Sequence, residues 1–559
     1  MDSYSYILDF WFSPYSGNKL WFQNDITKRK DIDKIICSKY KSILDKISNI
    51  PINLIISTWS NLDITAAIIC LDQFSRHIYR NNKKIIAKNT EQAKQLCDYL
   101  YASGIIYNHE LSLYIPFILM PYKHCDIFKH FPKIYKVISY FKDIKNLGNN
   151  KDNSFIWKFY QDSLKKYLLH DKQIENIYHL KKIGDISNIG IKSVCEYYPK
   201  HSENMVLNHK EPLYQIINKF LKKYKHFINN HLLVSLSGGP DSMVLVYILY
   251  LLGKNMNVNV EAFHINYGNR EESDIEQQMV SEFCSLNGIS LHVYKYPYIR
   301  RNNCPREFYE NITRTVRFNL YKYFKCPVIL GHIKDDLVEN IWTNIAKGRD
   351  LFKLHKIDEV DTIHGVDILR PFHRIDKKDI YLFARKYHIP YLKNTTPLWS
   401  NRGKIRNEFI PAVNKQFGQD TDNKILFLSD SLVSYHKLLD KMVFQPLLNS
   451  VVYNNFGLEI DISKFLDMDT HFWQYILTEL FHSMGESMPS IGSVQNFVSI
   501  INRGHVGMMT LKNRYYCYLD KNKHLFILKN SSIQKKICKP VLTKSEWLNI
   551  KNLLKTVEV

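Results

Sequence analysis

The segment at residues 232–249, LLVSLSGGPDSMVLVYIL, constrains the fold more than any other stretch of the chain. An apolar run typical of a β-strand, Leu232–Leu236, leads into a short polar turn. A second apolar run, Met243–Leu249, follows with the spacing of a helix. Strand, glycine-rich turn and helix together favour a phosphate site, because glycines let the backbone approach the anion and N–H groups of the first helical turn face it.

The turn itself supplies polar groups suited to phosphate and metal. It consists of Ser237, Gly238, Gly239, Pro240, Asp241 and Ser242. The serine hydroxyls are hydrogen-bond donors, and Asp241 is placed to hold Mg²⁺ against bound phosphates. The turn is not of the Walker type, which needs a lysine before the Ser/Thr. A plain strand-to-helix turn is the alternative interpretation.

Size and charge set further bounds on the protein. A chain of 559 residues is too long for one core, so we expect two to four domains. Its 76 Lys and Arg against 54 Asp and Glu give a net charge of +22, which favours a polyanionic partner, nucleic acid before membrane. A generally lysine-rich proteome is the other explanation for this charge.

Cysteine usage and hydropathy point to an intracellular protein. The ten cysteines include no C-x-x-C pair, which argues against a zinc ribbon, a redox motif or an iron–sulfur site, and we expect reduced thiols. The N-terminal residues lack the pattern of a signal peptide, and no apolar stretch is long enough to span a bilayer. We therefore expect a cytoplasmic location.

The apolar pattern divides the chain into four parts. Residues 1–185 are predicted to be helical, 186–212 to be a linker, 213–411 to be an α/β domain, and 412–559 to be helical and then β-hairpin. Four strands are predicted in the α/β domain: Leu232–Leu236, Val258–His264, Ser290–Tyr294 and Pro327–Leu330. Their alternation with helices predicts a parallel sheet covered on both faces. In the last part, 506–528 predicts a hairpin that turns at 520–522.

The helical first part contains a dense mixture of charged and apolar residues at Leu71–Arg80. Asp72, Arg76 and Arg80 are spaced as an ion-pair ladder on one helix face, or as a charged pocket. Residues 7–12, 20–22, 71–80 and 114–120 resemble a bacterial family of uncharacterised, all-helical, TPR-like proteins. That resemblance implies a helical fold and no particular activity.

Five polar segments follow the loop in the α/β domain. They are Phe263–Arg270, Glu310–Phe318, Gly331–Asn340, Ile368–Phe372 and Arg402–Pro411. The first and third follow predicted strands, where ligands bind in parallel sheets. Glu310, Arg314 and Arg317 share a helix face, as a salt-bridge stripe or as a source of cations for phosphate charge.

Asp336 and Glu339 form the most specific of these signals. Three residues apart at a helix start, both carboxylates face the strand ends. Acidic residues also suit the helix dipole, which is the simpler explanation. The functional hypothesis is a pocket for an ammonium group.

Residues 213–411 resemble the catalytic domain of the tRNA(Ile)-lysidine synthetase family, within the N-type ATP pyrophosphatases, because the SGGPDS loop and the five later segments occur in the family's order. The resemblance implies that the six loop residues and His264 bind ATP, that Asp241 binds Mg²⁺, and that Arg314 and Asp241 are catalytic. It further implies that Asp336 and Glu339 hold lysine, and that Arg402 and Arg406 position ATP or tRNA. The chain departs from the family pattern at Tyr267, Asn340, Gly403 and 394–397.

The expected activity is therefore an ATP-dependent ligase that adenylates a cytidine of an isoleucine tRNA and joins lysine to it. Two alternatives are another tRNA modifier of the same fold, such as a thiolase, and a decayed, non-catalytic tRNA-binding protein. The missing C-x-x-C pair speaks against the thiolase, and the retained loop and acidic pair speak against decay. A protein partner for the helical part and a homodimer both stay open.

Overall fold

A computed structural model describes most of the chain. The described residues are 3–13, 26–141, 154–180, 208–228, 230–269, 273–301, 304–349, 351, 354, 357–392, 401–418, 420–454, 457–504, 507–512 and 515–529. The aromatic segment 20–22, most of the expected linker (186–207) and the turn 394–397 lie outside them. The described part divides into two compact units, residues 1–339 with 357–411 and residues 340–356 with 412–559.

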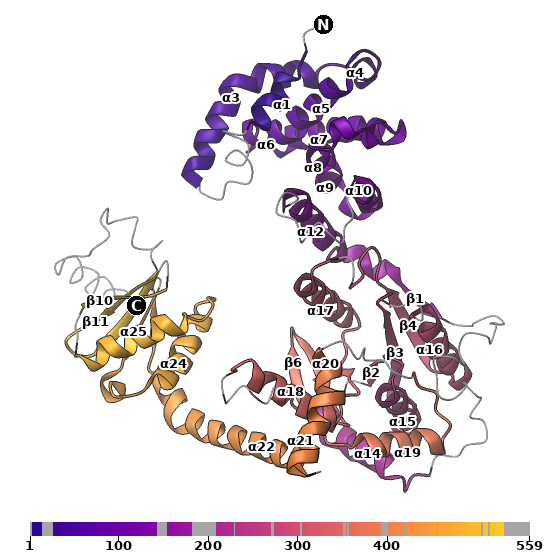
Figure 1. Ribbon diagram of the computed structural model, residues 1–559, viewed down its shortest axis with the longest axis vertical. Helices are drawn as coiled ribbons and strands as arrows, with labels where there is room; N and C mark the ends of the chain where they lie inside the picture. Colours follow the sequence, from indigo (N-terminus) through magenta and orange to yellow (C-terminus); the bar gives the residue numbers. More distant parts are fainter. Residues whose placement is uncertain are drawn as a thin grey trace. The chain divides into compact units, whose positions relative to one another are not determined.

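The first unit begins with the predicted helices (Figure 1), here called the helical region. Its elements are α1 (Tyr6–Trp11), α3 (Ile26–Ser48), α4 (Ile52–Thr58), α5 (Asn61–Ile69), η1 (Cys70–Phe74), α6 (Ser75–Ile78), α7 (Lys83–Ala102), η2 (Ile105–Tyr107), η3 (His109–Leu111), α8 (Ile115–Ile118), α9 (Met120–Cys125), α10 (Ile127–Phe141), α12 (Ser154–Leu168) and η5 (Asp171–Asn176). Capping side chains mark where helices begin: Ser60 accepts a hydrogen bond from the N–H of Asp63, and Asn82 from that of Ile85. Buried Trp11 packs edge-on against two buried phenylalanines, which centres the core there.

A seven-stranded sheet follows, in the order β1-β4-β3-β2-β5-β7-β6. Its strands are β1 (Ile177–Leu180), β2 (His231–Ser235), β3 (Asn259–Asn266), β4 (Ser290–Lys295), β5 (Val328–Ile329), β6 (Val360–Ile363) and β7 (Val366–Leu369). Its helices are α14 (Pro212–Lys223), α15 (Pro240–Met256), α16 (Ser273–Asn287), α17 (Arg306–Tyr323), α18 (Lys334–Ala346) and α19 (Lys377–Lys386). The strands β2, β3, β4, β5 and β7 are parallel, which confirms the predicted sheet.

Both faces of this sheet are buried, because neighbouring residues of β2 enter different cores. Leu233 packs with α17 residues such as Val316, whereas Leu232 and Val234 pack with α15 residues such as Leu245. Burial on both sides explains the nearly continuous apolar pattern of β2. Because β2, β3, β5 and β7 run parallel, their carboxyl ends meet at the same edge of the sheet, where the loop lies.

The helical region joins the sheet through β1, which the sequence did not reveal as a strand. β1 pairs antiparallel with β4 at the edge of the sheet. The Tyr294 hydroxyl donates to Gln173 Oε1 at 2.6 Å, and the Tyr160 hydroxyl donates to the Tyr298 carbonyl at 3.1 Å. The Tyr298 ring also contacts the ring of Phe131. Helical region and sheet therefore share one continuous core.

The end of the first unit carries a short helical segment. Its elements are α20 (Asn401–Lys404) and η8 (Ile405–Phe409), and α21 (Ile410–Phe417) continues from it.

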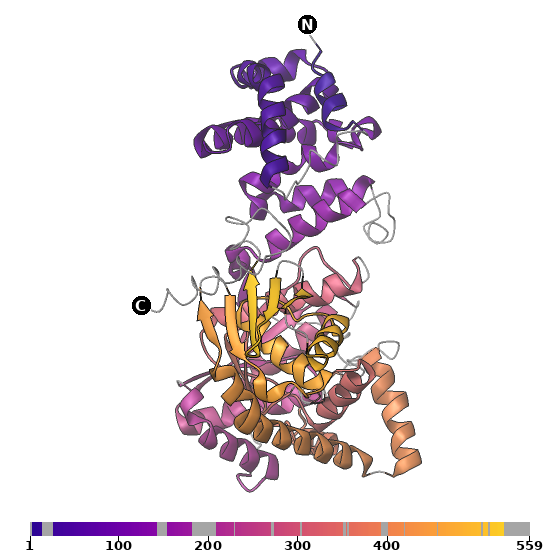
Figure 2. The ribbon, with the colours of Figure 1, turned by 90° about the vertical axis from the view of Figure 1, so that its left-hand side faces the viewer.

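The second unit combines helices with an antiparallel sheet of order β10-β11-β12-β9-β8. Its elements include α22 (Thr421–Leu439), η9 (Asp440–Phe444), α23 (Gln445–Asn449), β8 (Val452–Asn454), β9 (Gly457–Asp461), η10 (Ser463–Phe465), α24 (Thr470–Ser483), α25 (Ile491–Asn502), β10 (Gly507–Lys512), β11 (Tyr515–Leu519) and β12 (His524–Lys529). Figure 2 shows its strands in yellow. The pairing of β11 with β12 around 520–523 confirms the predicted hairpin. Among the described residues, no helix is long and apolar enough to cross a membrane.

Candidate active site

The glycine-rich loop connects β2 to α15 and adopts a backbone that requires glycine. Gly238 has φ +82°, and a Cβ there would lie 2.6 Å from Leu392 Cδ1. The Leu392 N–H donates to the Gly238 carbonyl at 2.9 Å, which fixes the turn. A Cβ on Gly331, after β5, would lie 3.0 Å from the Ser242 nitrogen, so β5 also approaches the start of α15 closely.

The two loop serines are hydrogen-bonded to each other. Their hydroxyl oxygens are 3.0 Å apart, and Ser242 Oγ also accepts from the Ser237 N–H at 3.1 Å. Pro240 occupies the first turn of α15, and Gly239 is its N-cap residue. This arrangement leaves N–H groups of the first helical turn without intrahelical acceptors, as an anion site needs.

Asp241 faces a cation that the sequence did not point to. Lys377 Nζ, at the start of α19, lies 3.0 and 2.8 Å from the two carboxylate oxygens of Asp241. Burial raises the pKa of the Asp241 carboxyl, and Lys377 opposes that rise. The nearby charge of Asp336 raises it further, which places the acidic pair within electrostatic reach of the loop.

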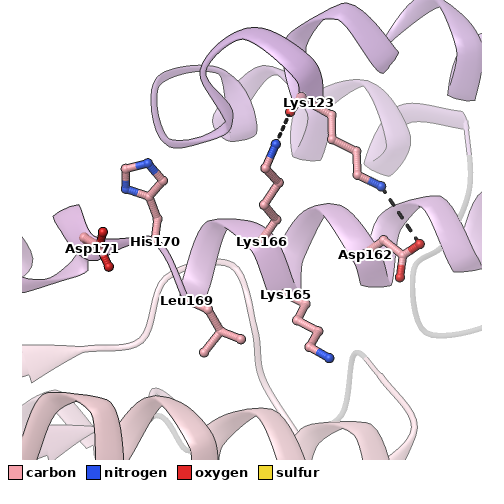
Figure 3. A pocket seen from close by; sticks show the side chains of 7 residues that line it. All are labelled: Lys123, Asp162, Lys165, Lys166, Leu169, His170 and Asp171. Carbon is pink, nitrogen blue, oxygen red and sulfur yellow. Dashed lines mark hydrogen bonds and ion pairs between the residues drawn. The ribbon is translucent and has the colours of Figure 1, made fainter. Parts of the chain in front are cut away.

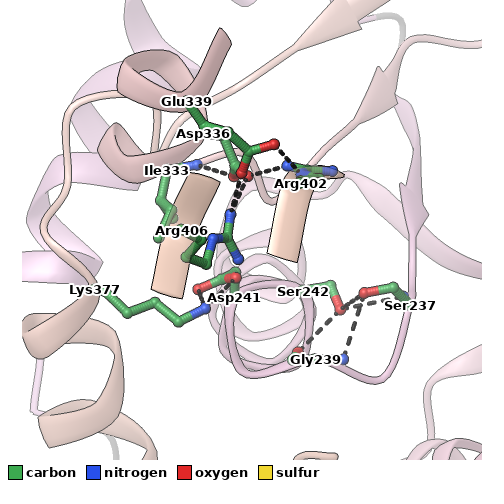
Figure 4. Close-up of polar contacts among 10 residues, drawn as sticks. All are labelled: Ser237, Gly239, Asp241, Ser242, Ile333, Asp336, Glu339, Lys377, Arg402 and Arg406. Carbon is green, nitrogen blue, oxygen red and sulfur yellow. Dashed lines mark hydrogen bonds and ion pairs between the residues drawn. The ribbon is translucent and has the colours of Figure 1, made fainter. Parts of the chain in front are cut away.

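Asp336 and Glu339 converge on two guanidinium groups (Figure 4). Arg406 Nη2 donates to Asp336 Oδ1 at 2.9 Å and to Glu339 Oε2 at 3.1 Å. Arg402 bridges the same two carboxylates, through Nη2 to Asp336 and through Nε to Glu339. In Figure 4 this cluster lies next to Asp241, with the Ser237–Ser242 turn beside it.

The acidic pair is buried, and the pKa values of its two carboxyl groups shift in opposite directions. Burial would raise the pKa of Asp336, but Arg402 and His332 outweigh burial and lower it. Burial raises the pKa of Glu339, and the arginines only partly oppose it. Both carboxylates are bonded to guanidinium groups, and the pocket for an ammonium group stays a prediction.

The remaining predicted residues occupy different positions around the loop. His264 is buried on β3, and its Nδ1–H donates to the Leu236 carbonyl at 2.9 Å; burial lowers its pKa. Arg314 is exposed, with its guanidinium carbon 5.5 Å from the centroid of the Phe318 ring. No described contact brings Arg314 to the loop.

Arg317, on the same helix, is the more enclosed of the two arginines. Burial would lower the pKa of Arg317, but Tyr267, Tyr321 and Tyr296 together outweigh burial and raise it. The Tyr267 ring stacks on Tyr296 at 5.1 Å, so this departure from the family pattern fills a defined place beside Arg317.

Arg370 and His332 form a further buried contact at the strand ends. Arg370 Nε donates to His332 Nδ1 at 3.1 Å, and burial lowers the pKa of His332 to about 4. Arg370 is buried at the end of β7.

Sequence reasoning missed Lys377, and it gave His332 no role of its own. Both reach their partners through the fold and not through a local pattern. The Lys377 and Asp241 positions are 136 residues apart, so no spacing rule connects them.

The loop fits Mg²⁺ bound together with phosphates. Mg²⁺ keeps several waters and commonly takes one or two protein carboxylates, with phosphate oxygens as further ligands. Asp241 offers one carboxylate at the helix start, and Lys377 already holds a positive charge there. Within the described ranges, no group of three or more His, Cys, Asp or Glu is arranged around a common metal position.

Both regions of the first unit match models of known protein families. Residues 212–413 match the model of the PP-loop domain family, and residues 7–178 match that of a bacterial protein family of unknown function, DUF924. The chain thus contains a PP-loop domain preceded by a DUF924 domain, and its helical N-terminal fold agrees with the family resemblance.

Among curated proteins, the chain has homologues that are tRNA(Ile)-lysidine synthases. It is 27% identical to that of Chlamydia muridarum over 292 residues, 50% of this chain and 88% of the relative. It is 25% identical to that of Streptococcus pyogenes over 312 residues, 55% of this chain and 68% of the relative. Among solved structures, the U34-tRNA thiolase NcsA of Methanococcus maripaludis aligns with 44% of this chain and 85% of its own, at 21% identity and a TM-score of 0.34.

Proposed function

We propose that the protein is an AMP-forming ligase that adenylates a cytidine of an isoleucine tRNA and joins lysine to it. The homologous tRNA(Ile)-lysidine synthases support the substrates, and the PP-loop domain supports ATP as the source of the adenylyl group. The observation that carries the proposal is the convergence of Asp336 and Glu339 on cationic groups beside the loop.

In the first step, ATP binds to the loop, with its phosphates at the N-terminus of α15. Asp241 would hold Mg²⁺, which would neutralise charge on the pyrophosphate. The O2 atom of the cytidine, turned out of its stack, attacks the α-phosphorus, and pyrophosphate leaves. Lys377, released from Asp241, is placed to bind a phosphate oxygen, and Arg314 has the catalytic role that the family implies.

In the second step, the ε-ammonium of lysine replaces a guanidinium at the acidic pair. The deprotonated amine forms a bond to C2 of the adenylated base, the C2–O2 bond breaks, and AMP leaves with O2. The ammonium gives its first proton to the acidic pair before the attack, where burial raises the pKa of Glu339. The attacking nitrogen gives its second proton to the phosphate of the leaving AMP. Arg402 and Arg406, once displaced, are free to contact ATP or tRNA.

The other parts of the chain have supporting roles in this proposal. We assign residues 213–411 to catalysis and 412–559 to tRNA binding, with 1–185 as a separate helical domain. A homodimer and a protein partner for the helical domain belong to the same proposal and need separate tests.

The test is AMP release by the full chain, measured with ATP, lysine and transfer RNA. We expect AMP only when lysine and an isoleucine tRNA are both present. The matched control omits lysine and keeps all other components. AMP release at the same rate without lysine would contradict the ligase, and release of no AMP with any tRNA would favour the decayed, non-catalytic alternative.

A further inference from the structure

The helical region contains a pocket that the proposed reaction does not use (Figure 3). Its volume is about 530 Å³, within the range of ligand pockets. Its lining residues come from α9, α12 and the turn that follows: Lys123, Asp162, Lys165, Lys166, Leu169, His170 and Asp171. Three lysines and a histidine against two carboxylates give the pocket a basic character.

The lysines of this pocket are only weakly neutralised by the protein. Lys123 Nζ lies 3.9 Å from an oxygen of Asp162, at the limit of an ion pair. Lys166 Nζ donates to the Lys123 carbonyl at 2.7 Å, an uncharged acceptor. Figure 3 shows Lys166 directed toward α9, and Lys165 leaving α12 on another side. Lys165 and Lys166 therefore face different sides of α12, an arrangement that suits a chain with several phosphates better than a single anion.

The surroundings of Lys123 also favour a bound anion. Burial lowers the pKa of Lys123, Asp162 opposes this, and the charges of Lys166 and Lys158 lower the pKa further. A bound anion would relieve both effects, because it favours the charged form of each lysine.

An aromatic stack lies at the same place. The His170 ring stacks on Phe128 with centroids 5.4 Å apart and planes 27° apart. Phe128 in turn stacks on Tyr167, also at 5.4 Å. Cations beside a stacked, partly exposed aromatic ring are the combination with which proteins bind single-stranded RNA, because phosphates pair with the cations and bases stack on the rings.

We propose that this pocket binds a single-stranded segment of the RNA substrate. Lys123, Lys165 and Lys166 would contact backbone phosphates, and His170 would stack on a base. The inference rests on the proposed function for its choice of tRNA as the RNA. It gives the helical region a task in substrate binding, separate from the chemistry at the loop.

The experiment measures tRNA affinity of the full chain by fluorescence anisotropy over a series of salt concentrations, without turnover. The variant Lys165→Ala/Lys166→Ala should weaken binding about tenfold and lower the slope of log Kd against log salt by about 1 to 2. His170→Ala should weaken binding about fivefold with little change in that slope, because stacking releases no counterions.

The matched control is Lys83→Ala/Lys84→Ala, which removes two adjacent, exposed lysines elsewhere in the helical region. It should leave the affinity and the salt slope nearly unchanged. An equal loss in both lysine variants would overturn the pocket in favour of net charge alone, and so would an unchanged affinity of Lys165→Ala/Lys166→Ala. Inorganic phosphate that displaces tRNA equally from wild-type and His170→Ala protein would show a phosphate site without base stacking, and would also overturn it.

This result is separable from that of the proposed function. A chain that loses tRNA affinity through these variants but forms no AMP supports the pocket and contradicts only the ligase. If the protein forms AMP and these substitutions leave its tRNA affinity unchanged, the result supports the ligase and contradicts the pocket.

Discussion

The helical region and the PP-loop domain each bury acidic side chains, and they neutralise them in different ways. In the helical region, Asp72 is fully enclosed and bonded to His124 Nδ1 at 2.9 Å, Arg76 Nη2 at 3.1 Å and Thr90 Oγ1 at 3.2 Å. Beside the loop, the partners of Asp336 and Glu339 are two arginines of one downstream segment, and the Arg402 side chain is 51% exposed.

The bonds around Asp72 form a fixed network, whereas the bonds of the acidic pair can be exchanged for bonds to a ligand. The donors to Asp72 come from α6, α7 and α9, so the carboxylate ties three elements of the core together. The half-exposed Arg402 side chain can turn into water while Arg406 keeps its bonds to both carboxylates. We infer that Asp72 serves the fold, although it lies in the π-helical turn η1, and that the acidic pair is free to accept a ligand.

The largest effect is expected from neutralising the acidic pair. Asp336→Asn or Glu339→Gln should lower lysine-dependent AMP release by about 10²- to 10³-fold, because each removes a charge that holds the ammonium. The thermal unfolding midpoint should change little, since the arginines can move to solvent. Glu307→Gln, which alters an exposed carboxylate of α17, is the matched control. Activity of Asp336→Asn within threefold of wild type would contradict the ammonium site.

The opposite pattern is expected for Asp72→Ala. Removing one partner of a buried ion pair costs about 3–5 kcal/mol, so the urea midpoint should fall while AMP release by the folded protein persists. An unchanged urea midpoint would contradict the fixed network.

The pH dependence of this loss provides a second readout. Burial would raise the pKa of Asp72, but His124 and Arg76 outweigh burial and lower it. The carboxylate therefore stabilises the fold above its unfolded pKa of about 3.9, and this contribution is lost as pH falls through the lowered folded pKa. The difference in unfolding free energy between wild type and Asp72→Ala should shrink below about pH 4. A difference that stays constant there would contradict the assigned charge.

The smallest effect is expected from Arg402→Ala. If Arg402 competes with lysine for the acidic pair, removing it should lower the lysine dissociation constant about threefold, in line with ~0.2–1 kcal/mol for an exposed pair. Isothermal titration of lysine into the ATP-bound chain measures this constant. Lys404→Ala, an exposed lysine of the same short helix, is the control. Weaker lysine binding by Arg402→Ala would make Arg402 part of the lysine site and not its competitor.

Local patterns predicted much of the PP-loop domain. The strands β2 to β5 and the hairpin β11–β12 are where alternating or continuous apolar runs placed them. The loop glycines are expected to let the backbone approach an anion, and Gly238 has φ +82°, a conformation that glycine adopts readily. Asp336 and Glu339 share a face because they are three apart on a helix.

Contacts between distant segments could not be predicted in this way. β1 lies in a segment whose pattern indicated helix, and it is a strand because β4 offers an unpaired edge. Arg402 reaches Asp336 across 66 residues, and no periodicity connects them. Helical spacing put Arg314 and Arg317 on one face, but only the fold shows that Arg317 is enclosed by tyrosines and that Arg314 is exposed.

The most direct test of the central claim, an ammonium site beside an ATP loop, is mass spectrometry of tRNA nucleosides. The purified full chain is incubated with ATP, isotope-labelled lysine and an isoleucine tRNA. The account predicts a cytidine whose mass has grown by labelled lysine less one water, formed by wild type and lost in Asp336→Asn. Unmodified cytidine after wild-type turnover of ATP, or the labelled nucleoside formed equally by Asp336→Asn, would contradict it.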